Sequence, residues 1–336
     1  LLVRHGNLAT QVLDVARAAG ADAVYWSRRY APHHAAADAV LTRTLAQAGL
    51  EPRAFSGSLL FEPMEVLTRA GGQFKVFSQF MKAAEPRFSF MAAPVAAPDA
   101  LPAPDQWPDG LPVAAVASVL GVPAALHLEL PLERYADDRE RPDLDGTSFM
   151  SPYLHFGEVS PRQVWHAASQ GEGGGAGAWT FRRELLWRDF SYHLLTANPG
   201  MPQAPLRPEF AAFPWVDDAE ALERWQAGQT GYPLVDAGLR CLNATGWMHN
   251  RVRMVAASFL VKHLLVPWQR GEGVFWRQLV DADLANNSAS WQWVAGCGVD
   301  AAPFFRIFNP VLQGQHFDPA GAFVRTWAPE LAGLPA

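Results

Sequence analysis

The chain has 336 residues, of which 49% are hydrophobic and 18% charged, so it can fold into two domains and is not intrinsically disordered. Its formal net charge of −6 is unlike a strongly basic nucleic-acid binder, so any DNA contact must depend on a local patch. The two cysteines, Cys241 and Cys297, exclude a disulfide framework and lack metal-site spacing. No signal peptide and no apolar run of roughly 18 residues is visible, so we expect a cytoplasmic protein without a membrane partner.

Residues 1–90 predict an α/β domain with a parallel sheet, because strand-like and helix-like runs alternate there. We expect helices over residues 7–19 and 32–48, and strands over residues 21–26 and 52–56. Two or three strands are few for a closed unit, and the chain begins at Leu1 in mid-pattern. The sequence therefore predicts a partial domain, truncated at its N-terminus.

Residues 91–133, rich in alanine and proline, predict a linker, and within it residues 113–130 fit no element. Residues 134–336 predict an all-α domain. Ser160 followed by Pro161 is typical of a helix start, and the periodicity predicts helices over 179–197, 233–243, 247–265 and 271–280. Of the 13 tryptophans, most follow Met150, a concentration that suits core packing, base stacking or electron transfer between rings.

The most unusual stretch is 281–293, DADLANNSASWQW, in which acids, amides and indoles lie close together. Asp283 or Asn286 is expected to cap a helix that carries Trp291 and Trp293. If those indoles only filled a core, the acids and amides would have no evident partner. A buried polar ligand would supply one, because buried polar groups need hydrogen bonds.

Two helical faces are candidate sites. Glu184, Trp187 and Arg188 share one face, although a surface ion pair beside a half-buried indole explains them equally well. Asn250 and Met254 share another, which a solvated helix edge explains as well. The hydroxyl run at 147–151 is either a phosphate cradle or a plain cap. No Walker or GxGxxG motif occurs and the histidines are scattered, so nucleotide-loop, hydrolytic and metal chemistry are disfavoured, and no metal is expected.

A series of motifs through the helical region resembles the photolyase/cryptochrome family, and within it the class I cyclobutane pyrimidine dimer photolyases. The matching runs are TSFMSPYLHFG at 147–157, WRDF at 187–190, GYPLVD at 231–236, GWMHNR at 246–251, DAD at 281–283, NN at 286–287, WQW at 291–293 and DAAPFFRIFNP at 300–310. The resemblance implies a partial α/β antenna-type domain followed by an all-α FAD-binding domain. Residues 21–87 are similar to the later half of the antenna domain.

The resemblance implies FAD, reduced in the active state, with an antenna chromophore of the folate or deazaflavin type. Arg253 is similar to the arginine that pairs with Asp281, and Asn287 matches the residue facing the flavin's central ring. Phe149 departs from the family, which commonly has arginine there, so a side-chain phosphate contact at this position is in doubt. The implied cofactor residues are Tyr135, Thr147, Ser148, Phe149, Met150, Ser151, Arg188, Arg253, Asp281, Ala282, Asp283 and Asn287.

The implied activity is light-driven repair of dimers in DNA, carried out by a monomer. Trp291, Trp268 and Trp215 match the family's electron-relay tryptophans, and Glu184 and Asn287 its catalytic residues. A dimer flipped out of the duplex would meet the lesion pocket; photolyases are among the standard examples of base-flipping enzymes. The residues that match the pocket and its DNA contacts are Arg139, Trp187, Asn250, Arg251, Met254, Trp293, Arg306 and Gln313.

Three alternatives remain. A cryptochrome photoreceptor would not repair DNA, and Asn287 argues against the plant type, which carries aspartate there. A (6-4) photolyase carries histidine in the pocket where this chain has Asn250 and Met254, and its chemistry needs the imidazole as a proton donor. The third is an inert fragment that keeps the fold without activity.

Overall fold

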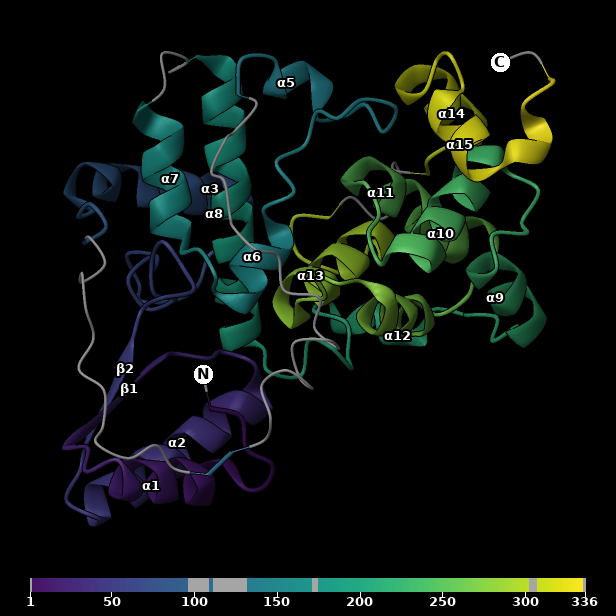
Figure 1. Cartoon of the computed structure of the whole chain (residues 1–336). Coiled ribbons are helices and arrows are strands. Elements are labelled where there is room, and N and C mark those ends of the chain that lie inside the picture. Colours follow the sequence, from purple (N-terminus) through teal and green to yellow (C-terminus); the bar gives the residue numbers. More distant parts are fainter. Residues whose placement is uncertain (1, 96–108, 111–131, 171–174, 302–306, 335–336) are drawn as a thin grey trace.

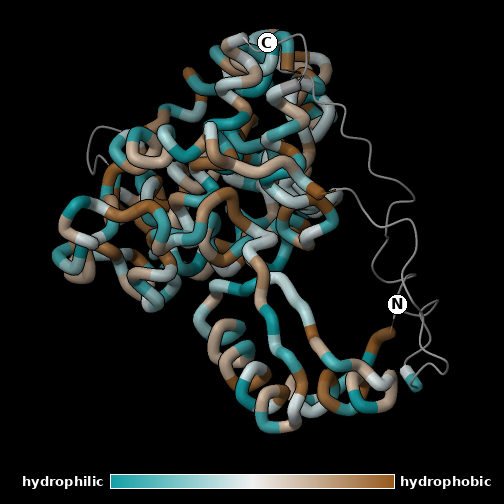
Figure 2. Tube along the Cα trace, turned by 90° about the vertical axis from the view of Figure 1, so that its left-hand side faces the viewer, coloured by the Kyte–Doolittle hydropathy of each residue, from teal (hydrophilic) through white to brown (hydrophobic). Residues whose placement is uncertain are grey.

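The computed structural model describes residues 2–95, 109–110, 132–170, 175–301 and 307–334. A small α/β lobe lies beside a larger helical body, which confirms the predicted fold class (Figures 1 and 2). The expectations for residues 113–130 and for Arg306 fall outside the described residues. No helix within the described ranges is long and apolar enough to cross a lipid bilayer.

The lobe contains α1 (Leu8–Ala18), β1 (Ala23–Ser27), α2 (Pro32–Gln47) and β2 (Glu51–Phe55). The strands pair in parallel with Ala23 opposite Glu51, as the alternation of elements predicts. The Asn7 side chain accepts a hydrogen bond from the main-chain N–H of Thr10 and so caps α1. α2 packs against β2 and α1 packs against α2, and Ala9, Leu41 and Leu45 form a small separate core.

Residues 60–84 follow the lobe in sequence but pack into the helical body. Leu60, Phe61, Phe77 and Phe80 belong to one buried cluster with residues of α7 (Pro161–Gln170) and α8 (Ala176–Ala197). This segment includes α3 (Phe77–Ala84) and continues into the 3-10 helix η1 (Glu85–Phe90). The domain boundary expected at residue 90 stays a prediction.

Two buried polar side chains of α8 fasten the preceding loop. The carboxylate of Asp189 accepts main-chain hydrogen bonds from Leu60 at 3.3 Å and Phe61 at 2.9 Å, and His193 Nε2 accepts one from Phe74 at 2.9 Å. Burial raises the pKa of Asp189 to about 7, although these N–H donors favour the charged form. The face of α8 that carries Asp189 and His193 is therefore hydrogen-bonded to the segment that contains Leu60, Phe61 and Phe74.

Most helices of the helical body pack around two buried clusters, one that includes α7 and α8 and a larger one in its C-terminal part (Figure 1). Ser160 and Gln163 form a reciprocal capping box at the start of α7, as the Ser-Pro pair predicts. The remaining elements are α5 (Tyr135–Asp138), α6 (Ser151–Phe156), η2 (Pro208–Ala212), α9 (Ala219–Gln226), α10 (Pro233–Thr245), α11 (Asn250–Ser258), the π-helical turn η3 (Phe259–His263), α12 (Trp268–Gln278), α13 (Leu284–Ala295), α14 (Pro310–Phe317), α15 (Ala322–Trp327) and η4 (Pro329–Leu331).

Three predicted helices begin at different residues in the structure, and one of them, α8, starts at Ala176 rather than at Trp179. The helix expected over 247–265 begins only at Asn250, because His249 accepts the Arg251 N–H and caps α11, and its last turn is the π-helical η3. The helix expected from Gly271 begins at Trp268, directly after Pro267. A Cβ on Gly271 would lie 2.2 Å from the Trp291 ring, so the glycine that obscures this helix in the sequence permits the close approach of α13.

Candidate functional site

Asp281 lies just before α13 and is paired with an arginine of α11. Arg253 Nη2 donates to both Asp281 carboxylate oxygens, at 3.1 and 2.9 Å, while its Nε donates to Met248 O at 2.7 Å. The pairing implied by the resemblance is therefore present. Both groups are fixed, and their contact with a cofactor stays a prediction.

Asp283 is the N-cap of α13, as one of the two sequence alternatives predicts. Its Oδ1 accepts from the Asn286 main-chain N at 2.9 Å, and its Oδ2 accepts from Tyr192 OH and lies 3.5 Å from His155 Nδ1. Burial opposes ionisation, but the hydrogen bonds and the nearby Arg188 charge prevail and hold the pKa of Asp283 at about 2. The carboxylate is charged at neutral pH.

Asn287 is held by the neighbouring helix. Its Nδ2 donates to the main-chain O of Glu272 in α12 at 3.1 Å, so the amide nitrogen faces α12. Within the described residues no hydrogen bond reaches its Oδ1. The Glu272 carboxyl accepts from Ser288 Oγ, and burial raises its pKa.

These contacts correct one argument drawn from the sequence. The acids and amides of 281–287 do not lack protein partners, because Arg253, Tyr192, His155 and the Glu272 carbonyl supply them. Tyr192 and His155 come from α8 and α6, and no pattern in the sequence marks them as partners of Asp283. The presence of acids and amides at 281–287 therefore does not by itself require a bound ligand.

Polar atoms without partners do occur nearby. Thr147 Oγ1 and His249 Nε2 are buried and have no hydrogen-bond partner among the described residues. His249 Nδ1 accepts the Arg251 N–H, and burial lowers the pKa of His249 to about 4, so the neutral ring carries its proton on Nε2. A buried donor and a buried hydroxyl without partners fit a polar ligand such as the phosphates and sugars of FAD.

The loop over 147–151 leads into α6. Phe149 has a φ of 51°, rare for a bulky residue, and its ring centroid lies 4.8 Å from that of Trp247. Ser148 Oγ accepts from the Met150 main-chain N at 3.4 Å, and Met150 is buried. The Phe149 ring is directed to Trp247, which leaves backbone and hydroxyl groups of this loop for a cofactor.

Arg188, one of the implied cofactor residues, donates hydrogen bonds to main-chain carbonyls of the protein. Its Nη1 donates to Ser58 O and its Nη2 to Leu154 O at 3.4 Å, and the guanidinium lies 5.1 Å from the centre of the Tyr192 ring. It links the N-terminal segment to α6. Its charge is nevertheless close enough to lower the pKa of Asp283.

Glu184 lies beside a tyrosine and an arginine rather than in a purely apolar pocket. Tyr135 OH donates to Glu184 Oε2 at 2.9 Å, and Arg139 Nη2 lies 2.5 Å from Oε1. Burial raises the pKa of Glu184, and both neighbours oppose the rise. Tyr135, which the resemblance implies as a cofactor residue, has its hydroxyl directed to Glu184 here.

The sequence analysis missed Glu140. Its Oε2 accepts from Arg251 Nε at 2.6 Å and its Oε1 lies 2.5 Å from Arg139 Nη1, so one carboxylate bridges two predicted DNA contacts. Arg251 also covers the Phe317 ring at 4.2 Å. A continuous network therefore runs from Tyr135 through Glu184, Arg139 and Glu140 to Arg251. The only sequence feature that could have indicated this network is the acidic residue directly after Arg139.

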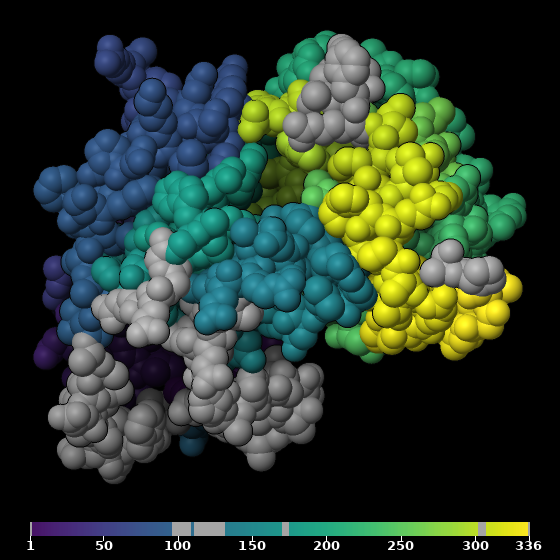
Figure 3. Space-filling view, turned by 90° about the horizontal axis from the view of Figure 1, so that it is seen from above, coloured from purple at the N-terminus to yellow at the C-terminus, as the bar shows by residue number. Residues whose placement is uncertain are grey.

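The predicted lesion and DNA contacts lie on α8, α11, α13 and α14, with Arg139 directly after α5. Trp187 is 38% exposed, and Asn250 Nδ2 contacts Met254 Sδ at 3.8 Å. Trp293 Nε1 donates to Asp300 O at 3.1 Å. Gln313 Oε1 is buried without a partner among the described residues. Figure 3 shows a hollow in the upper face where α8, the segment containing α5 and the C-terminal helices meet.

Two of the predicted relay tryptophans are buried. Trp291 and Trp268 are each 2% exposed, and Trp215 is partly buried. Trp291 lies against Gly271 on α12, the helix that starts at Trp268. The ring of Trp225, which the sequence analysis did not single out, lies 6.2 Å from Trp291, and its Nε1 donates to Ala256 O. Trp291 therefore has Trp225 as an aromatic neighbour.

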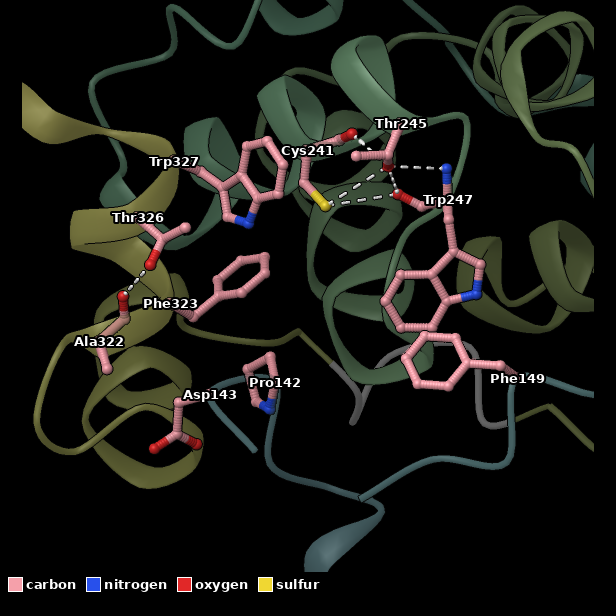
Figure 4. Close-up of a pocket in the computed structure, with 10 residues that line it drawn as sticks. All are labelled: Pro142, Asp143, Phe149, Cys241, Thr245, Trp247, Ala322, Phe323, Thr326 and Trp327. Carbon is pink, nitrogen blue, oxygen red and sulfur yellow. Dashed lines mark hydrogen bonds between the residues drawn. The ribbon is translucent and has the colours of Figure 1, made fainter. Parts of the chain in front are cut away.

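A cavity of about 500 Å³ opens between α10, α15 and the loop before Phe149 (Figure 4). Only Phe149 is shared with the predicted cofactor residues, so the cavity does not coincide with the acids and amides described above. Its walls are mainly aromatic and apolar. The lining residues are Pro142, Asp143, Phe149, Cys241, Thr245, Trp247, Ala322, Phe323, Thr326 and Trp327.

Comparison with known proteins gives consistent matches. Residues 181–336 match the family model described as the FAD binding domain of DNA photolyase, and residues 1–105 match the model described as DNA photolyase. A deoxyribodipyrimidine photo-lyase of Agrobacterium fabrum is 42% identical over 99% of this chain and 74% of its own length.

Solved structures agree. A crystal structure titled as a class III photolyase from Agrobacterium tumefaciens has a TM-score of 0.90 and 41% identity, covering 98% of this chain and 73% of that one. An archaeal photolyase from Sulfolobus tokodaii, titled as containing two FAD molecules, has a TM-score of 0.82 and 30% identity, covering 100% and 75%. A Synechocystis cryptochrome has a TM-score of 0.86 and 29% identity, covering 100% and 74%.

Proposed function

The chain belongs to the photolyase/cryptochrome family, and we propose that it repairs cyclobutane pyrimidine dimers in DNA with light, using FAD as its cofactor. The observation that carries the proposal is the arrangement on α8. Glu184 and the exposed indole of Trp187 share one face. Arg139 lies next to Glu184, and Glu140 bridges Arg139 to Arg251.

We place FAD between the 147–151 loop, α11 and the start of α13. Support comes from the partnerless Thr147 Oγ1 and His249 Nε2, and from the fixed Arg253–Asp281 pair. Ser148, Met150 and Ser151 would contribute backbone and hydroxyl contacts, and Ala282 and Asp283 would border the ribose and ring. Phe149 would contribute its main chain only, since its ring is directed to Trp247.

Reduced FAD, when bound, supplies the excited-state electron that splits a dimer. Asn287 is the residue we assign to its central ring. Because the Glu272 carbonyl fixes the amide nitrogen, the Oδ1 is left as an acceptor for a ring N–H. An uncharged acceptor suits a reduced flavin, since it stabilises that N–H without adding a second negative charge beside it.

Glu184 is the residue we assign to the lesion carbonyls. Its carboxyl would form a hydrogen bond to the dimer where negative charge develops, and burial shifts its pKa upward, in the direction that favours a proton there. Trp187 and Trp293 supply flat surfaces for the flipped bases, and Asn250 and Met254 border them. Gln313 and the arginines position the backbone.

Trp291, Trp268 and Trp215 are proposed to carry electrons to oxidised FAD from outside. Trp291 and Trp268 are buried and so are shielded from water.

An antenna chromophore of folate or deazaflavin type would bind the lobe. Action as a monomer and the division into domains at 90 and 133 are further proposals. On its motifs we place the chain in class I, and the similarity to a structure titled class III makes that class the alternative.

The test is repair itself. Purified protein with reduced FAD should remove dimers from an oligonucleotide under blue or near-ultraviolet light and leave them intact in the dark. Undamaged DNA should bind more weakly. Light-dependent spectral changes without dimer loss would favour a cryptochrome, a second candidate supported by the Synechocystis structure. Repair of (6-4) products alone would favour that class instead.

A further inference from the structure

Trp187 is stacked on a residue from the N-terminal segment. The ring of Phe77, the first residue of α3, lies parallel to the Trp187 indole, with 3.6 Å between centroids and an angle of 9°. Phe77 is 3% exposed, whereas Trp187 is 38% exposed. The phenyl ring therefore covers one face of the indole and leaves the rest of its surface accessible. Phe190 meets the same indole edge-on at 5.9 Å.

Asp300 connects this stack to the second indole of the lesion pocket. Its Oδ2 accepts a hydrogen bond from the Phe77 main-chain N–H at 3.3 Å, at the start of α3. Its main-chain O accepts from Trp293 Nε1 at 3.1 Å. Asp300 holds a φ of 54°, in the left-handed region that aspartate tolerates better than most residues. One residue thus contacts groups that orient both indoles.

We propose that Phe77 and Asp300 are positioning residues for lesion recognition. Phe77 fixes the plane of Trp187 through its ring, and Asp300 fixes Phe77 and Trp293 together. The segment before residue 90 would then contribute to substrate binding through α3. This inference rests on the proposed function, because it assumes that a flipped dimer stacks on these indoles.

The physical reason is preorganisation. A side chain that is already ordered loses less conformational freedom when a ligand binds, so the same contact gives tighter binding. Trp187 is partly exposed and would otherwise choose among rotamers. A parallel aromatic neighbour favours one plane, since stacked rings attract beyond their buried area. A merely space-filling residue at position 77 would not have this effect.

The first experiment compares three variants. Phe77→Leu keeps apolar volume but removes the ring, and Phe77→Tyr keeps the ring. Phe80→Leu is the matched control, because Phe80 is equally buried on α3 but its ring packs against Phe74, Phe190 and His193. We expect Phe77→Leu to weaken binding of a dimer-containing oligonucleotide by about three- to tenfold. Its repair yield per bound dimer and its FAD absorption should stay normal.

Phe77→Tyr should bind nearly as the unaltered protein does, and Phe80→Leu should lose stability without a selective loss of dimer affinity. Equal affinity losses for Phe77→Leu and Phe80→Leu would overturn the proposal, since both would then act through general packing. For Asp300, the Gly variant keeps the positive φ and the carbonyl but removes the carboxylate. Asp300→Gly should weaken dimer binding and Asp300→Asn should largely restore it.

A readout without DNA separates this inference from the proposed function. In protein labelled with 5-fluorotryptophan, the ¹⁹F resonance of Trp187, assigned from Trp187→Phe, should shift or broaden in Phe77→Leu and not in Phe80→Leu. If it is unchanged in Phe77→Leu, the positioning role is wrong, whatever the DNA results. If the signal responds but the unaltered protein shows no preference for dimers, the proposed function fails, and with it the claim that these residues serve recognition.

Discussion

Glu140 and Arg251 form an ion pair across the helical body, from the end of α5 to the first turn of α11. Arg251 Nε donates to Glu140 Oε2 at 2.6 Å, and the same carboxylate meets Arg139 through its other oxygen. Glu140 thus partly neutralises Arg139 and Arg251, the two arginines that we assign to DNA binding. A DNA phosphate would have to compete with the Glu140 carboxylate for them.

Glu140→Gln should make DNA binding tighter and more salt-dependent. The amide still accepts a hydrogen bond from Arg251, but Arg251 loses its counter-charge and Arg139 keeps only Glu184. At low salt we expect a several-fold gain in affinity for undamaged DNA and a slope of log K against log salt steeper by about one unit. Fluorescence anisotropy titrations across salt concentrations measure both. Glu209→Gln is the control, because it removes the same charge from an exposed pair with Arg207. Weaker binding in Glu140→Gln would mean that Glu140 orients the arginines more than it neutralises them.

Glu184→Gln should lower the repair yield per photon more than it lowers dimer affinity. Glutamine keeps the shape and an acceptor for Tyr135 OH, but it cannot share a proton with a lesion carbonyl. A charge-assisted hydrogen bond is worth roughly 1.5–3 kcal/mol. Because the yield reflects competition between ring splitting and electron return, we expect a fall of about two- to fivefold. Actinometry with pre-reduced protein gives the yield, and an unchanged value excludes the assigned role.

Asp283→Asn should destabilise the protein at neutral pH and change its response to acid. The folded pKa of about 2 lies below the ordinary 3.8, so the ionised carboxylate contributes stability. That contribution is complete above roughly pH 4 and disappears as the pH falls through about 2. The shift corresponds to about 2 kcal/mol, at roughly 1.4 kcal/mol per pKa unit. Urea unfolding from pH 7 to pH 2 measures it.

In that series the difference between the unaltered protein and Asp283→Asn should shrink between about pH 4 and pH 2. Asp217→Asn provides the comparison, because Asp217 pairs with Arg270 at an exposed position. A pH-independent difference for Asp283→Asn would show that its cost comes from altered capping of α13 and not from charge.

Much of this arrangement follows from local sequence signals, and the missing parts are non-local. The N-cap Asp283 and the helix face of Glu184 and Trp187 were predicted from local pattern and spacing, and the Asp281–Arg253 pair was implied by the family resemblance. Their partners were not, because Tyr192, His155 and Glu140 meet them only after distant segments pack together. The start of α12 at Trp268 was not predicted, because Gly271 interrupts the helical pattern in the sequence. That glycine is needed for the tight contact with the Trp291 ring. The π-helical turn after Ser258 has no periodic signature of its own.

The electron relay gives the last prediction. Trp268→Phe keeps most of the apolar volume at a buried position, so it should cost on the order of 1–1.5 kcal/mol if packing is its only role. Phenylalanine is much harder to oxidise than tryptophan, so it cannot carry the electron hole along the relay. With oxidised FAD and an external reductant, the variant should fail to photoreduce. With chemically reduced FAD it should still repair dimers, because repair sends the electron to the lesion and does not use the relay.

Trp225 decides how a different result is interpreted. Its ring lies 6.2 Å from Trp291, so it offers a second neighbour to which the vacancy can move. Trp225→Phe alone should leave photoreduction largely intact if Trp268 lies on the main route. If Trp268→Phe photoreduces normally and the double variant does not, the electron passes through Trp225 and the assigned relay is wrong. Loss of repair by Trp268→Phe with pre-reduced FAD would show damage to the fold, which the urea unfolding curve of the same variant would register independently.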